Sequence, residues 1–212
     1  MSKKLKILVT GGVGFIGSNL IGKLLELGHE VHSLDNYDSG MIENEIEGCN
    51  YISGDIEVLD WYDTPKFDLC FHLAALSRIQ PSFEFPQETF RVNTKGTLSV
   101  LEWAKRNDIR VVYSGSSSVH HNPIQSPYAL FKSMGEDLCR MYRRVYDLDT
   151  EIVRFYNVYG KNEIIDGDWA AVIGIWRRQI RDGEKITIVG DGEQRRDFTN
   201  VTDIVDGLIK IS

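Results

Sequence analysis

The chain has 212 residues, with 24 basic and 31 acidic side chains and a formal net charge of −7 at neutral pH. This acidic balance argues against nucleic acid as a partner. No apolar run approaches the roughly 20 residues that span a bilayer. Residues 1–4 lead directly into an apolar segment without a secretory hydrophobic region, and three widely spaced cysteines form no metal pattern. We therefore expect a cytoplasmic protein with reduced thiols, without a metal site or a membrane segment.

The amino-terminal segment predicts a nucleotide-binding turn. An apolar strand at 5–10 runs into a glycine-rich stretch, and an amphipathic helix follows at 15–27. Gly11, Gly14 and Gly17 have the G-x-G-x-x-G spacing, which allows a tight turn, close approach of the backbone to a pyrophosphate, and close packing of helix on strand. The diphosphate then lies at the amino end of the helix, where free N–H groups favour negative charge. A glycine turn without a ligand is the alternative.

A second strand, at 30–34, ends in an acidic residue. Asp35 lies about 20 residues past the glycines, the spacing at which a carboxylate reaches the adenosine ribose hydroxyls. It would repel a 2′-phosphate, and no Arg or Lys occurs between Glu30 and Asn50 to neutralise one. NAD is therefore favoured over NADP. Asp35 could instead be an ordinary turn residue before Asn36.

The rest of the chain alternates between strand and helix patterns. Further strands are expected at 49–53, 68–73, 110–114 and 150–155, with helices near 84–106 and 127–146 and a short polar stretch at 57–62. Strands separated by helical crossovers predict an α/β fold, a Rossmann-type doubly wound parallel sheet.

The pattern changes after about residue 155. A helix near 169–182, a short strand at Lys185–Val189, a turn at 190–192 and a helix beginning near Thr202 suggest a smaller carboxyl-terminal lobe. We therefore predict two parts, 1–155 for the cofactor with the catalytic helix and 156–212 for the substrate.

Tyr128 and Lys132 carry the catalytic signal. Residues four apart share one face of a helix, so the Lys132 ammonium can lie near the phenol and lower its pKa. A Tyr-x-x-x-Lys alone is weak evidence, and a second copy occurs at Tyr62 and Lys66. That copy contains Pro65 and lies in a polar loop, so it cannot present both side chains on one helical face. We interpret it as a chance match.

A run of serines supports the assignment of Tyr128. Strand 110–114 leads into Ser116, Ser117 and Ser118, and ligands of doubly wound sheets lie beyond the carboxyl ends of the strands. Hydroxyl groups there could hydrogen-bond a substrate hydroxyl as it becomes a carbonyl. A serine-rich turn that caps the next segment is the alternative.

With these motifs in this order, the chain resembles the extended short-chain dehydrogenase/reductase family, in particular NAD-dependent nucleotide-sugar epimerases and dehydratases of the UDP-sugar 4-epimerase type. The resemblance extends over essentially all of the chain. Its matching stretches are 10–17, 54–56, 72–75, 92–97, 116–119, Tyr128 with Lys132, 154–160, 190–192 and 196–198.

The resemblance implies a role for each matching position. The catalytic set would be Ser116, Tyr128 and Lys132. Cofactor-binding residues would be Gly11, Gly14, Phe15, Ile16, Gly17, Asp35, Asn36, Asp55, Ile56, Leu73, Ala74, Ala75, Asn93, Tyr128 and Lys132. The substrate would meet Ser116, Ser117, Asn157 and Arg196, where a guanidinium suits a bidentate hold on phosphate. Arg195 competes for the role of Arg196.

The implied function is epimerisation of a nucleotide sugar, at C4 of a UDP-hexose, through a keto sugar. Dehydratases of the family carry Asp and Glu where this chain has Ser117 and Ser118, and the missing acid at Ser118 also argues against decarboxylation. An NAD-binding module without turnover, and a 4,6-dehydratase or reductase, remain alternatives. The first of these arises because relatives continue beyond Ser212, so the substrate lobe looks truncated.

Two further expectations concern the loop after Val119 and the oligomeric state. The segment 120–125 is shorter than in relatives, which could change how the sugar is enclosed, and its adjacent histidines are not expected to bind a metal. Relatives commonly form homodimers through helices corresponding to 84–106 and 127–146. Residues suited to that contact, or to ordinary packing on the sheet, are Leu98, Leu101, Trp103, Leu138, Met141 and Tyr142.

Overall fold

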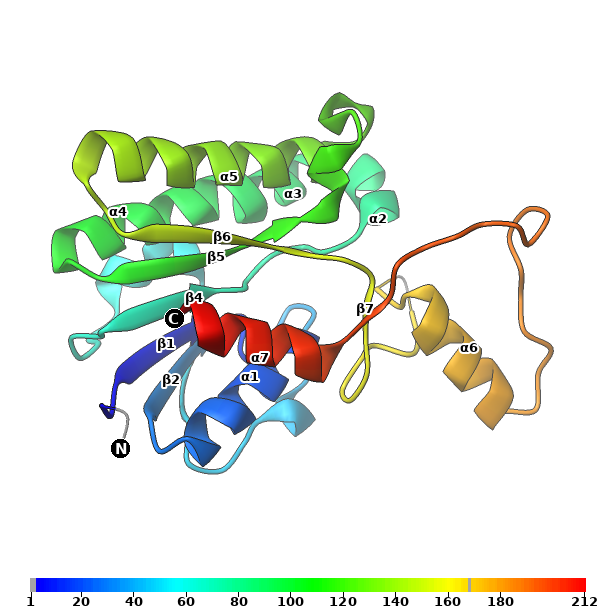
Figure 1. Ribbon diagram of the computed structural model, residues 1–212, viewed down its shortest axis with the longest axis horizontal. Helices are drawn as coiled ribbons and strands as arrows, with labels where there is room; N and C mark the ends of the chain where they lie inside the picture. The colour runs from blue at the N-terminus through cyan, green and yellow to red at the C-terminus, as the bar shows by residue number, and fades with distance from the viewer. Residues whose placement is uncertain (1–2, 168) are drawn as a thin grey trace.

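A six-stranded parallel sheet forms the centre of the protein (Figure 1). The computed structural model describes residues 3–167 and 169–212. The strands are β1 (Lys6–Thr10), β2 (Glu30–Asp35), β3 (Asn50–Ser53), β4 (Leu69–His72), β5 (Arg110–Ser116) and β6 (Thr150–Phe155). Their order is β3-β2-β1-β4-β5-β6. This is the doubly wound Rossmann order, so the predicted fold class is confirmed.

Helices cover both faces of the sheet, which explains why strands such as β4 and β5 are buried almost throughout. On one face lie α1 (Phe15–Glu26) and α7 (Val201–Ile211) (Figure 1). On the other lie α2 (Ile79–Glu84), α3 (Pro86–Phe90), the π-helical η3 (Arg91–Gly96), α4 (Thr97–Asn107) and α5 (Pro127–Tyr146). Short 3-10 turns are η1 (Ile42–Asn44), η2 (Ile56–Trp61), η4 (Ser117–His120) and η5 (Pro123–Gln125).

The helix expected near 84–106 is present as a continuous helical stretch from Pro86 to Asn107, made of α3, the π-helical η3 and α4. A separate helix that was not expected, α2, ends at Glu84. Pro86 explains the break between α2 and α3, because a proline disfavours helical geometry in the residue before it, and Phe85 has φ −121° and ψ 60°. By contrast, α5 begins where its sequence predicts, with Ser126 as N-cap and Pro127 in the first turn.

The strand expected at Lys185–Val189 is absent from the part of the chain that the structure describes. The segment is extended but pairs with no strand, and Ile188 and Val189 are exposed. Side chains of α6 (Val172–Arg181) fix its middle instead: Gln179 Oε1 accepts from the Thr187 backbone N–H at 3.0 Å, and Trp176 Nε1 donates to the Thr187 carbonyl at 2.8 Å. The apolar residues at 186, 188 and 189 therefore do not mark a strand.

The carboxyl-terminal segment returns to the sheet. A small parallel pair, β7 (Val158–Tyr159) with β8 (Thr199–Asn200), places Thr199 beside Val158 and Asn200 beside Tyr159. From there α7 packs beside α1, and Val201, Val205 and Leu208 join the hydrophobic core under the sheet. Figure 1 shows α6 and the loop after it projecting to one side, while α7 lies against the body. The two-part division at residue 155 stays a prediction.

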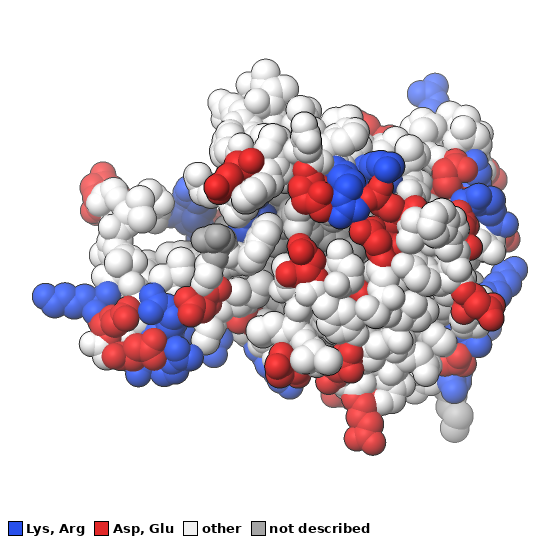
Figure 2. All heavy atoms as spheres, turned by 180° about the vertical axis from the view of Figure 1, so that it is seen from behind, with Lys and Arg blue, Asp and Glu red and all other residues white. Residues whose placement is uncertain are grey.

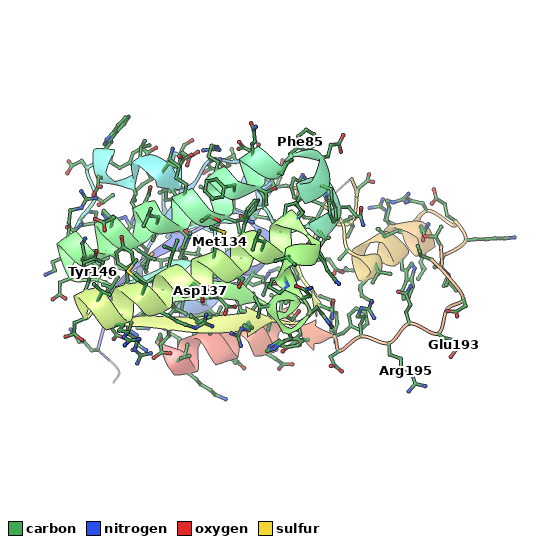
Figure 3. The ribbon with its side chains drawn as sticks, turned by 90° about the horizontal axis from the view of Figure 1, so that it is seen from above. Phe85, Met134, Asp137, Tyr146, Glu193 and Arg195 are labelled. Carbon is green, nitrogen blue, oxygen red and sulfur yellow. The ribbon has the colours of Figure 1, made fainter. Side chains whose placement is uncertain are left out.

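Some residues considered for a dimer contact serve the core instead. Leu101, Trp103 and Tyr142 are almost fully buried beneath α4 and α5. Leu98 and Met141 are partly exposed on the outer faces of the same helices. Figure 3 shows Met134 and Asp137 on the outer side of α5. The homodimer therefore stays a prediction. Fewer of the side chains considered for its contact are exposed than the sequence alone suggested.

Candidate active site

A large cavity lies at the carboxyl ends of the strands, where ligands of doubly wound sheets bind. Its volume is about 1040 Å³, the upper end of the range for small-molecule sites. The register of the sheet explains its place, because β1 pairs with both β2 and β4 and ends level with them at Thr10, Leu34 and His72. Lining residues come from the glycine turn, β2, the loops after β3, β4 and β5, the start of α5, and the segments around 157 and 196.

The glycine turn leaves room for a pyrophosphate. Gly11 has φ +76°, and a Cβ there would lie 2.7 Å from the Ala74 backbone nitrogen. A Cβ on Gly17 would collide with the Gly11 carbonyl oxygen. Gly14, the N-cap of α1, lines the cavity, and its Cβ would approach only the Gly11 carbonyl oxygen, at 3.2 Å, among the described atoms. The open side of Gly14 and the amino end of α1 therefore suit an anionic ligand.

Asp35 joins the glycine turn to the end of β2. Its Oδ2 accepts from the Val13 backbone N–H at 3.0 Å, and its Oδ1 accepts from the Tyr37 N–H at 2.9 Å. Burial raises the pKa of the Asp35 carboxyl, and these N–H groups partly offset the rise. Asp35 and Asn36 both line the cavity. A buried carboxylate at this place fits ribose hydroxyls and repels a 2′-phosphate.

Asp55 and Ile56 lie where the adenine is expected. Asp55 Oδ1 accepts from the Glu57 N–H at 2.9 Å, and its Oδ2 accepts from Arg91 Nη1 at 2.9 Å. Arg91 also pairs with Glu57 and Glu88, so a charged cluster from η2, α3 and η3 fixes this edge of the cavity. In Figure 2, which shows the back of the molecule, acidic and basic side chains lie intermixed.

The wall formed by Leu73, Ala74 and Ala75 is held from beneath. Thr10 Oγ1 accepts from the Ala74 backbone N–H at 3.2 Å and lies 2.8 Å from His72 Nδ1. Burial lowers the pKa of His72 to about 3, so its imidazole is neutral and serves this network. The sequence alone did not single out Thr10 or His72 for this task.

Asn93 acts on the same wall through the backbone of Leu76. Its Nδ2 donates to the Leu76 carbonyl and its Oδ1 accepts from the Leu76 N–H, both at 2.9 Å. Asn93 is 1% exposed and is not among the described residues that line the cavity, whereas its neighbour Val92 and its partner Leu76 are. We therefore propose that Asn93 supports the cofactor site without touching the cofactor.

Ser116, Tyr128 and Lys132 all line the cavity. Ser116 ends β5, whereas the other two lie one turn apart on α5. The amino end of α5 is fixed on α2, where Ser82 Oγ accepts from the Tyr128 backbone N–H at 3.1 Å. Ser116 Oγ accepts from the Ser118 N–H and from the Ser118 hydroxyl, at 3.2 and 2.9 Å. The sheet and the helix thus bring the three predicted catalytic residues together.

The electrostatics of this set differ from our expectation. Burial raises the pKa of the Tyr128 phenol, and the influences that offset part of the rise are Ser116 and the positive charge of Arg78. Lys132 is itself 3% exposed, and its Nζ lies 4.5 Å from the centre of the Tyr113 ring. Burial lowers the pKa of Lys132 to about 8. The expected lowering of the Tyr128 pKa by Lys132 is therefore not what this structure gives.

Asn157 and Arg196 line the cavity from two neighbouring segments. Asn157 Nδ2 donates to the Asp197 carbonyl at 2.8 Å, which fixes the two segments side by side, and both residues line the cavity. Arg195 also lines it, yet in Figure 3 its side chain extends outward from the loop. Arg196 therefore stays our candidate for a substrate phosphate.

Two other sequence features have ordinary roles. Tyr62, in the second Tyr-x-x-x-Lys, accepts from the Asp55 backbone N–H at 2.9 Å and lies outside the helices, consistent with a chance match. His120 stacks on Tyr156 with ring centres 6.0 Å apart. Within residues 3–167 and 169–212, no group of three or more metal-ligating side chains is found, and no helix is long and apolar enough to cross a membrane.

The fold and the cavity define a Rossmann-type protein with a dinucleotide site beside a Tyr-Lys pair. The family model described as the NAD dependent epimerase/dehydratase family matches residues 7–212. The chain is 35% identical over 228 residues to UDP-glucose 4-epimerase of Mycolicibacterium smegmatis, which covers 97% of this chain and 72% of the relative. It is 32% identical to UDP-N-acetyl-alpha-D-glucosaminuronate decarboxylase of Bacillus cytotoxicus, over 97% of this chain and 70% of the relative.

Among solved structures, UDP-glucose 4-epimerase of Thermotoga maritima with UDP-glucose superimposes with a TM-score of 0.89. The two chains are 30% identical, over 96% of this chain and 72% of the other. This chain therefore belongs to the NAD dependent epimerase/dehydratase family, whose members are nucleotide-sugar enzymes, and its cofactor is NAD. The glycine cradle and Asp35 fit that cofactor.

Proposed function

We propose that this chain epimerises a nucleotide-activated hexose, a UDP-sugar, at C4. The observation that carries the proposal is the convergence of Ser116, Tyr128 and Lys132 on one cavity that also contains the NAD cradle. Similarity to UDP-glucose 4-epimerases over nearly the whole chain supports it. Bound NAD supplies the hydride acceptor and donor for the reaction.

The side chains then have distinct tasks. Tyr128 Oη takes the proton from the sugar hydroxyl and returns it at the end of the cycle. Ser116 hydrogen-bonds the same oxygen while its charge changes, because its hydroxyl is already held at the end of β5 by the turn of Ser118. Lys132, which is buried one turn after Tyr128 on α5, holds the nicotinamide ribose and supplies positive charge. Asn157 and Arg196 bind the diphosphate of the substrate.

The residues after Ser116 favour epimerisation over elimination or decarboxylation. Loss of water from the neighbouring carbon needs an acid–base pair, and Ser117 and Ser118 offer hydroxyls where dehydratases carry acids. Ser118 is also committed to its hydrogen bond with Ser116. Because decarboxylases are among the relatives, decarboxylation is tested alongside epimerisation.

The test is direct conversion of substrate. The purified chain with NAD is incubated with UDP-galactose, UDP-glucose and their N-acetyl forms, and the anomeric protons are followed by NMR. We expect interconversion of at least one pair, abolished in Tyr128→Phe and retained in Tyr146→Phe, a matched control at a half-exposed tyrosine of the same helix.

Other outcomes would contradict the proposal. Bound NAD without any conversion would favour a binding module without turnover. A 4-keto-6-deoxy product would favour a dehydratase and would contradict our interpretation of Ser117 and Ser118.

A further inference from the structure

Arg78 is a cation on the cavity wall that neither the NAD cradle nor the catalytic set uses. It follows β4 and is the N-cap residue of α2. Its Nε donates to the Trp169 carbonyl at 2.7 Å, and its Nη1 makes a long contact of 3.4 Å with the Ser77 carbonyl. In the described part of the chain no carboxylate forms an ion pair with it. The guanidinium is therefore held in place by carbonyls, with its charge unneutralised.

This charge lies at the reacting end of the cavity. Arg78 and Tyr128 line the same cavity, and the positive charge of Arg78 acts to lower the pKa of the Tyr128 phenol. The contact between Ser82 and the Tyr128 backbone holds α2, which begins just after Arg78, against the start of α5. The carboxylates of the NAD site, Asp35 and Asp55, belong to the adenosine end, at the carboxyl ends of β2 and β3.

The surroundings of Arg78 do not neutralise it. Glu163 acts on it only at a distance, and that carboxylate is paired with Arg177 at 2.6 Å. The turn after β5 offers the hydroxyls of Ser117 and Ser118 in place of acids, and Lys132 adds a second buried cation nearby. Asp38 and Glu88 line a smaller pocket together with Arg78, but among the described residues neither forms an ion pair with it, and Glu88 pairs with Arg91 instead. The guanidinium of Arg78 is therefore left without an ion-pair partner in the described part of the chain.

A partly buried guanidinium without a counter-ion is costly, and its planar fork matches a carboxylate. Two phosphate-binding places are already assigned, at the amino end of α1 and at Asn157 with Arg196. With the phosphates of cofactor and substrate placed there, the remaining candidate for an anion beside Arg78 is the sugar itself. The anionic group that a hexose carries within reach of C4 is a carboxylate at C6.

We propose that Arg78 binds a carboxylate of the sugar, so that the preferred substrate is a nucleotide-activated uronic acid. This inference rests on the proposed function and narrows it. The reaction stays an oxidation at C4 with return of the same hydride, and the carboxylate is bound without chemical change. Arg78 is in this account a specificity-determining residue.

The test compares UDP-glucuronate with UDP-glucose, which differ only in the oxidation state of C6. Dissociation constants for both are measured by calorimetry on the NAD-loaded protein, and kcat/KM for both by NMR. Wild type should prefer UDP-glucuronate by about tenfold or more in each measurement. In Arg78→Met we expect a loss of about 10- to 100-fold for UDP-glucuronate, the range for a charge-assisted pair, and little change for UDP-glucose.

Two further variants separate charge from geometry. Arg78→Lys keeps the charge without the fork and should fall between wild type and Arg78→Met. Arg181→Met is the matched control, because Arg181 is an exposed arginine of α6 that pairs with Asp182 and does not line the cavity. It should leave both substrates unaffected. If Arg78→Met does not fold, the preference of the wild type for UDP-glucuronate and the affinity of Arg78→Lys for UDP-glucuronate still test the role of Arg78.

The results distinguish the two proposals. Conversion of UDP-glucose with no preference for UDP-glucuronate would overturn the role of Arg78 and leave the proposed function intact. An equal loss for both substrates in Arg78→Met would do the same. Tight binding of UDP-glucuronate that depends on Arg78, without turnover of any nucleotide sugar, would support the carboxylate site and contradict the epimerase assignment.

Discussion

Two glycines of the same motif should respond very differently to alanine. A methyl group on Gly14 would meet only the Gly11 carbonyl oxygen, at 3.2 Å, among the described atoms, and its backbone (φ −75°, ψ 174°) is allowed for any residue. A methyl group on Gly17 would collide with that oxygen and with the Gly12 backbone. The first change should therefore spare the fold, and the second should not.

The magnitudes follow from these contacts. Gly14→Ala should cost about 1 kcal/mol or less in the free energy of unfolding, the size of an N-cap change. Because the new methyl group enters the space left for the pyrophosphate, it should weaken NAD binding at least about tenfold, or 1.4 kcal/mol. Gly17→Ala should cost about 3 kcal/mol, the upper part of the range for overpacking, because backbone must move.

Urea denaturation and calorimetric titration with NAD measure the two quantities. Gly207→Ala is the matched control: it lies in α7 with open space around its Cβ position. It should raise stability by about 0.5–1 kcal/mol, the helix-propensity difference, without changing NAD affinity. Unchanged NAD binding in Gly14→Ala would refute the location of the pyrophosphate.

Three other predictions concern buried charges. Glu136 is 1% exposed and forms ion pairs with Arg154 at 2.6 Å and Arg140 at 2.7 Å. Glu136→Gln should therefore lower the free energy of unfolding by about 3–5 kcal/mol, measured by urea denaturation. A loss below about 1 kcal/mol would contradict a structural role for these ion pairs. Burial lowers the pKa of Lys132 in the folded protein to about 8. Between pH 8 and the pKa of a lysine in the unfolded chain, the unfolded chain therefore binds more protons than the folded protein. The free energy of unfolding should rise with pH across this range, by about 3 kcal/mol in total. Lys132→Met should lose that slope in pH-dependent denaturation, and an unchanged slope would refute the lowered pKa of Lys132. Asp35→Asn should weaken NAD binding and should lower the preference of the protein for NAD over NADP. An unaltered ratio of the dissociation constants for NAD and NADP would exclude a contact between Asp35 and the ribose.

Much of the sheet could be predicted because each strand has a local signature. The apolar run before Gly11, the acid at Asp35 and the continuous apolar residues of β4 and β5 predict the strands and a parallel sheet without tertiary information. The same holds for α5, whose Ser126 and Pro127 mark its beginning. Tyr128 and Ser116 were found because strand ends and helix starts meet at one edge of such a sheet.

The failures share a different cause, since they depend on contacts that the local sequence does not encode. The segment 186–189 has the composition of a strand, but no strand in the described part of the chain pairs with it. The pKa of Tyr128 depends on burial and on Arg78, whose orientation is set by the Trp169 carbonyl far along the chain. The cofactor contact expected of Asn93 stays a prediction, and the hydrogen bonds of its amide to the Leu76 backbone had no local signature in the sequence. Arg78 lies alone in the loop after β4, and no sequence motif around it indicated a role in the site.

The central claim is that Tyr128 drives a transient oxidation at C4 with direct return of the hydride. It is tested most directly by running the conversion of a UDP-sugar in heavy water and examining C4 of the product by NMR. The account predicts that wild type retains the original protium at C4, and that Tyr128→Phe, which still binds NAD, forms no product. Deuterium at C4, or undiminished conversion by the variant, would contradict it.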